Sequence, residues 1–103
     1  PVAERDFEAI LPDKYNSFRA YPHLEARLRQ RVSPEEAALL LEALLRRERL
    51  EPGARLELYG ELAAHFGALA DFPESATLGL SDEQFLRNVA ESLYRHGPGR
   101  NRT

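Results

Sequence analysis

Residues 33–49 read SPEEAALLLEALLRRER, and this segment gives the clearest structural signal in the chain. Ser33 suits the N-cap of a helix, Pro34 suits the first helical position, and Glu36 stands where a capping box needs an acid. The apolar residues that follow form two stripes at helical spacing: Ala37, Leu40, Leu41, Leu44 and Leu45 on a broad one, and Leu39, Ala43 and Leu50 on a narrow one. Since a surface helix needs only one stripe, we expect residues 33–50 to form the central helix of a small all-α domain, packed on both sides.

The composition limits the class of protein. A chain of 103 residues has room for one domain, and 43% hydrophobic with 30% charged residues is enough to bury a core. The absence of cysteine excludes disulfides, thiolate metal sites and a cysteine nucleophile. A net charge of −3 argues against a protein that coats nucleic acid. The preference for arginine, with Lys14 the only lysine, indicates a thermophilic or GC-rich bacterial source.

Periodic apolar residues and end signals predict the other helices. They are expected over residues 2–11, 22–32 and 54–70, with a last helix capped by Ser81 and ended by Gly97-Pro98-Gly99. Together with the central helix they make a bundle of four to five helices. The helical domain is therefore assigned to residues 1–97, and a disordered tail to residues 98–103.

Two segments lack a clear helical period. Residues 12–21 are expected to form a loop with one helical or 3₁₀ turn, capped by Asn16-Ser17. Three aromatic residues pin this loop to the core: Tyr15, Phe18 and Tyr21. Residues 71–80 interrupt the helices, because they contain Pro73 and Gly79.

The apolar faces of the expected helices predict the core. The helix over residues 54–70 carries a wide face: Leu56, Leu58, Tyr59, Leu62, Ala63, Phe66 and Leu69. Combined with the faces of the central and last helices, this gives an expected core of Leu40, Leu41, Leu44, Leu62, Phe66, Phe85 and Val89.

No catalytic or metal-binding motif is present. The three histidines, His23, His65 and His96, fall on different elements, and no two are four residues apart. Ser33 and Ser81 are explained as helix caps, and no serine lies in a nucleophile-elbow sequence. We therefore expect a protein that is not an enzyme, with no metal, no cofactor and no small-molecule substrate.

A basic run near the end of the central helix offers one sharper hypothesis. It consists of Arg46, Arg47, Arg49 and, after a short turn, Arg55. Arginines at the junction of two helices resemble a helix-turn-helix, which favours DNA binding. The alternative is that they complement the negative end of the helix dipole. Because Glu48 and Glu51 are interspersed and the net charge is negative, we favour the second interpretation and expect no nucleic-acid partner.

A stripe of small residues lies on the helix over residues 54–70, away from its large apolar side chains: Gly60, Ala64, Gly67 and Ala68. Each helical glycine costs about 1 kcal/mol relative to alanine. The stripe suits a close helix contact, either inside the domain or with a second molecule, which includes a homodimer. A tolerated exposed surface is the alternative, and the sequence leaves both open.

Three segments together resemble a known family: RDFEAILPDKYNSFRAYP, SPEEAALLLEALLRRERLEPGARLELYGELAAHF and LSDEQFLRNV. They are similar to the C-terminal cytosolic helical region of bacterial RDD family membrane proteins. Arg5-Asp6-Phe7 is not the Arg-Asp-Asp signature of that family's transmembrane part. The resemblance implies a cytosolic tail that meets the membrane only through its parent protein, and that has no established chemistry.

We therefore expect a cytoplasmic, non-enzymatic helical module for protein interaction or regulation, with a protein partner or a homodimer. The alternative is a free-standing DNA-binding or transcription-regulatory helical domain. In either case, the longest wholly apolar run of the chain is residues 37–41, far short of the roughly 18 residues that cross a bilayer.

Overall fold

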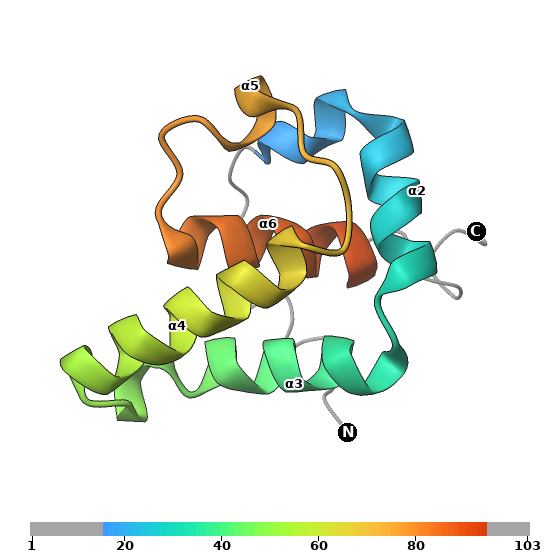
Figure 1. Ribbon diagram of the computed structural model, residues 1–103. Helices are drawn as coiled ribbons and strands as arrows, with labels where there is room; N and C mark the ends of the chain where they lie inside the picture. Colours follow the sequence, from blue (N-terminus) through green and yellow to red (C-terminus); the bar gives the residue numbers. More distant parts are fainter. Residues whose placement is uncertain (1–15, 95–103) are drawn as a thin grey trace.

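The computed structural model describes residues 16–94, and the regular elements within them are all helical (Figure 1). In chain order they are the 3₁₀ helix η1 (Ser17–Ala20), α2 (Pro22–Arg31), α3 (Pro34–Leu45), the 3₁₀ helix η2 (Arg47–Arg49), α4 (Pro52–Gly67), α5 (Glu74–Thr77) and α6 (Asp82–Tyr94). The predicted all-α class is therefore confirmed. The helix expected over residues 2–11, the tail over residues 98–103, Tyr15 and His96 lie outside the described residues.

The start of α3 follows the predicted capping box. The Ser33 hydroxyl accepts a hydrogen bond from the Glu36 amide at 3.0 Å, and the Glu36 carboxylate accepts one from the Ser33 amide at 2.8 Å. The helix ends at Leu45, so the expected range of 33–50 is too long. Beyond it, the amide of Arg49 donates to the Arg46 carbonyl three residues back at 2.8 Å, which tightens the chain into the 3₁₀ helix η2.

The helix that contacts most of the other elements is α6, which takes the central place that the sequence assigned to residues 33–50. It packs against α2, α3, α4 and η1, and it runs through the middle of the molecule in Figure 1. The expected packing on both sides holds only in part within the described residues. Leu39 on the narrow stripe is 57% exposed, whereas Leu50 is partly buried against the core. Of that stripe, Ala43 is buried.

All seven predicted core residues are buried, which confirms that part of the prediction. Leu56 is the error on α4, since 72% of its side chain is exposed. In Figure 1 the N-terminal end of α4 extends beyond the start of α6.

The two irregular segments hold short helices of their own. Asn16 caps η1 as predicted, since its side-chain oxygen accepts a hydrogen bond from the Phe18 amide at 2.8 Å. The expected break after α4 contains α5, whose Ala76 is buried. Gly79 then turns the chain with a φ of 78°, a conformation that glycine adopts without strain.

Candidate binding groove between α4 and α6

The small residues of α4 divide into two groups in the structure. Gly60 and Gly67 face α6: a Cβ atom at Gly60 would lie 3.5 Å from Asp82 Oδ2, and one at Gly67 would lie 3.9 Å from Phe85 Cζ. Ala64 and Ala68 are exposed. The stripe predicted from the sequence is therefore partly occupied by a helix of the same chain and partly open to solvent.

An open groove of about 490 Å³ lies where α4 and the start of α6 diverge. Its α4 wall is made of small residues: Gly60, Ala63, Ala64 and Gly67. Its opposite side is formed by the connection from α4 to α6 and by the start of α6: Phe72, Thr77, Leu80, Ser81, Asp82 and Phe85. Mostly apolar groups thus surround a space that small side chains on α4 leave free.

Aromatic packing supports this groove from beneath. The ring centroids of Phe72 and Phe85 are 5.1 Å apart, and those of Phe18 and Phe85 are 5.9 Å apart with the rings nearly perpendicular. Phe18 is completely buried. Because such ring pairs lie in the favourable range of distance and tilt, the groove has a well-packed apolar base.

Two exposed leucines lie close in sequence to residues that line the groove. Leu56 precedes Gly60 by about one helical turn and therefore continues the same side of α4. Leu78, which is 75% exposed, lies between two lining residues, Thr77 and Leu80. Each of these leucines is thus an exposed apolar side chain next in sequence, or one helical turn away, from a lining residue.

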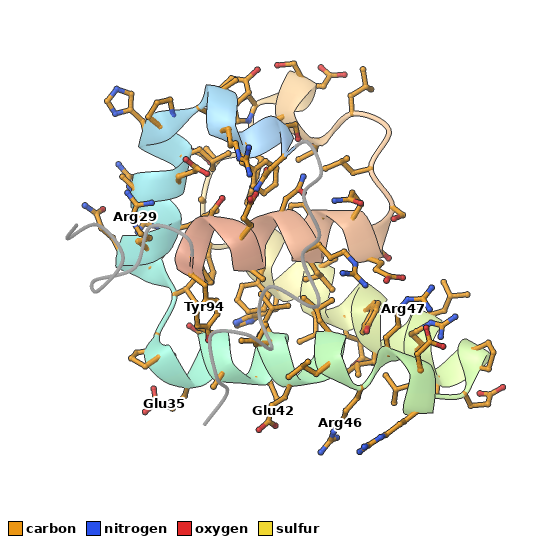
Figure 2. The ribbon with its side chains drawn as sticks, turned by 180° about the vertical axis from the view of Figure 1, so that it is seen from behind. Arg29, Glu35, Glu42, Arg46, Arg47 and Tyr94 are labelled. Carbon is orange, nitrogen blue, oxygen red and sulfur yellow. The ribbon has the colours of Figure 1, made fainter. Side chains whose placement is uncertain are left out.

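The predicted basic patch is divided. Arg47 Nε donates to the Glu83 carboxylate at 2.5 Å, and Arg55 Nη1 donates to the Arg47 carbonyl at 3.1 Å. Arg46 and Arg49 are exposed, and Figure 2 shows Arg46 projecting on the same outer side of the molecule as Glu42, away from Arg47. The four arginines therefore do not form one continuous basic surface.

The Arg47–Glu83 contact also sets the ionisation of both groups. The hydrogen bond to Glu83 raises the pKa of Arg47 above its ordinary value. Burial acts to raise the pKa of Glu83, but hydrogen bonds from Arg47 and Arg87 outweigh it and lower that pKa. Both groups stay charged at neutral pH, so this pair is a fixed link between η2 and α6.

The sequence did not predict a buried polar cluster on the other side of α6. The amide of Asn16 donates to the Glu91 carboxylate, which also pairs with Arg19, and the Ser92 hydroxyl donates to the Glu25 carboxylate at 2.9 Å. Three polar residues of α6 are buried there, Asn88, Glu91 and Ser92, so hydrophobic periodicity carried no signal for them. These contacts join η1 and α2 to α6 and lie away from the groove lining.

The groove lining contains few polar side chains. They are Thr77, Ser81 and Asp82, and the Ser81 hydroxyl already accepts the Gln84 amide at 3.1 Å. No histidine, lysine or arginine is among the lining residues, so a nucleophile–base pair is missing there. Within residues 16–94, no three His, Cys, Asp or Glu side chains gather as metal ligands do.

Comparisons with protein-family models, curated proteins and solved structures find no match for this chain. The resemblance to the RDD family region therefore stays a prediction from the sequence. Among residues 16–94, no helix has both the length and the apolar character that crossing a membrane requires.

Proposed function

We propose that this domain is a non-enzymatic protein-interaction module that binds an amphipathic helix of a partner protein in the α4–α6 groove. The observation that carries the proposal is the open, mostly apolar groove with small residues on one wall. The exposed Leu56 and Leu78, close in sequence to lining residues, add to it. An amphipathic helix laid into an apolar groove is a common mode of peptide recognition.

The energetic argument rests on the exposed leucines. Fully burying one leucine side chain contributes about 1.5–3 kcal/mol. A partner helix that covers Leu56 and Leu78 removes both from water and gains contact with Phe72 and Phe85 at the base of the groove. The surface therefore has the apolar content that a modest, reversible contact needs.

The glycines support the same proposal. A Cβ atom at Gly60 or Gly67 would meet its neighbours at ordinary contact distances of 3.5 and 3.9 Å, so packing inside the domain has room for alanine. Neither residue has a positive φ. Glycine disfavours a helix by about 1 kcal/mol relative to alanine. Neither tight packing nor backbone conformation requires glycine here, so we attribute both glycines to the open space that they leave in the groove.

The cellular setting is part of the proposal. The resemblance to the RDD family region supports a cytosolic tail that recruits or regulates a partner next to the membrane protein to which it is attached. DNA binding has less support, because Arg47 and Arg55 are held in contacts within the domain and Arg46 projects elsewhere.

A displayed library of random 16-residue peptides, selected on the 103-residue protein, tests the proposal. Ala64→Trp fills the groove from an exposed position, and Ala38→Trp makes the same change on the exposed surface of α3. We expect peptides with helical apolar spacing that bind the wild type and Ala38→Trp but not Ala64→Trp. Selected peptides that bind all three proteins equally, or no peptides at all, would overturn the proposal. A second copy of this chain could also occupy the groove, and sedimentation of the wild type alone tests this by measuring its oligomeric state.

A further inference from the structure

The charges around the groove are unevenly distributed. Asp82 lines it, and its carboxylate lies 3.5 Å from the position that a Cβ atom at Gly60 would take. Glu57 and Glu61 are exposed on α4, one turn before Gly60 and Ala64 respectively. Three carboxylates therefore stand in or beside the groove.

The basic side chains of α4 turn to a different side. Arg55 and His65 each lie five positions from Gly60, which places them about 140° around the helix from it. Arg55 donates to the Arg47 carbonyl at 3.1 Å, and His65 Nε2 lies 2.6 Å from Glu36 Oε2. The first contact is with η2 and the second with α3, and neither Arg47 nor Glu36 lines the groove.

The three carboxylates are free to meet a partner. The ion pairs among residues 16–94 engage Glu36, Glu48, Glu83 and Glu91, and none engages Glu57, Glu61 or Asp82. Asp82 lies in the first turn of α6, where the helix dipole favours an acid. That role leaves both carboxylate oxygens able to accept hydrogen bonds, and the missing side chain at Gly60 leaves room beside them.

We propose, building on the function above, that the groove selects a basic amphipathic helix. The apolar face of that helix covers Leu56 and Leu78, and a lysine or arginine at its edge pairs with Asp82. Glu57 and Glu61 attract further basic residues on its solvent side. Charge complementarity of this kind sets specificity and association rate. The same carboxylates repel phosphate groups, which argues against RNA or an anionic membrane as the occupant.

Two designed 18-residue helical peptides test this inference. They share one leucine and alanine face and carry either lysine or glutamate at every polar position. Each is titrated into the ¹⁵N-labelled 103-residue protein, and the amide signals of Gly60 and Gly67 are followed. We expect the lysine peptide to shift both signals and to bind about ten-fold or more tightly than the glutamate peptide, with affinity falling as salt rises.

Asp82→Asn should lower the affinity for the lysine peptide by about two- to five-fold, as removal of one exposed ion pair does. Glu42→Gln removes the same charge from the outer side of α3 in Figure 2 and should leave the affinity unchanged. Equal, salt-independent binding of the two peptides at Gly60 and Gly67 would overturn this inference and leave the groove as a binding site. No shift at either glycine, together with no groove-dependent peptide from the library, would overturn both proposals.

Discussion

The hydroxyl of Tyr59 donates a hydrogen bond to the backbone carbonyl of Ala43 at 2.8 Å. Because α3 ends at Leu45, Ala43 is among the last four residues, whose carbonyls have no partner inside the helix. Tyr59 is buried, and burial is the main reason why its pKa lies above the ordinary value. One side chain of α4 thus supplies the missing donor at the end of α3. The two helices diverge from this end in Figure 1.

Removal of this hydroxyl should cost stability. Tyr59→Phe keeps the ring but leaves the buried Ala43 carbonyl without its donor, which we expect to lower the free energy of unfolding by about 1–3 kcal/mol. Urea denaturation measures the change. Tyr21→Phe is the matched control, because its hydroxyl meets Ser75 at an exposed site and should cost no more than about 0.5 kcal/mol. Equal losses in the two variants would contradict the assignment.

A cavity in the core should cost more. Leu44 is 2% exposed, and Leu44→Ala is expected to lower the free energy of unfolding by about 2–5 kcal/mol. Leu39→Ala, on the exposed side of the same helix, is the control and should change it by less than about 0.5 kcal/mol. Near-wild-type thermal stability of Leu44→Ala would show that the inward face of α3 is assigned wrongly.

Local chemistry explains why some of the fold could be predicted. The caps at Ser33 and Asn16 depend on residues within three positions, so the sequence shows them directly. Hydrophobic spacing likewise identified the inward faces of α3, α4 and α6. Spacing states which side of a helix is apolar, but it does not state which neighbour covers that side. The exposure of Leu56 and the central place of α6 therefore could not be predicted.

The groove likewise has one wall that the sequence indicated and one that it did not. Gly60 and Gly67 were noticeable in the sequence because glycine is unusual inside a helix. The opposite wall comes from Phe72, Thr77 and Leu80, in a segment that has no periodic pattern. Only the tertiary packing of that segment against α6 brings the two walls together.

The buried polar cluster gives a prediction that spacing did not suggest. Asn16 caps η1 and also donates to the Asn88 carbonyl at 3.2 Å and to the Glu91 carboxylate. Asn16→Ala removes the cap and both donated bonds, and we expect a loss of about 1–3 kcal/mol in unfolding free energy. Asn16→Ser keeps a capping oxygen, so its free energy of unfolding should fall by less. If serine and alanine lose the same amount, the cap contributes nothing.

Acidification should weaken the capping box of α3 and, with it, the contact of Glu36 with α4. Hydrogen bonds from the Ser33 amide and from His65 lower the pKa of Glu36 below its ordinary value of 4.5. Because the folded state holds this proton less tightly than the unfolded state, the contribution is complete above pH 4.5 and is lost as the pH falls through the lowered pKa. Glu36→Gln should therefore show a smaller loss of thermal stability than the wild type between pH 5 and about pH 3. Parallel pH curves for the two proteins would contradict this reasoning.

Replacing the groove glycines should separate stability from binding. Gly60→Ala and Gly67→Ala each remove the helix penalty of glycine, and their new Cβ atoms meet Asp82 and Phe85 at ordinary contact distances. We expect each variant to gain about 0.5–1 kcal/mol in unfolding free energy.

The same methyl groups occupy space in the groove, so a groove-dependent peptide should bind the double variant more weakly than the wild type. Gly53→Ala, in the first turn of α4 and outside the groove lining, should leave peptide affinity unchanged. A double variant that is more stable and binds the peptide as well as the wild type would show that the glycines serve no purpose in recognition.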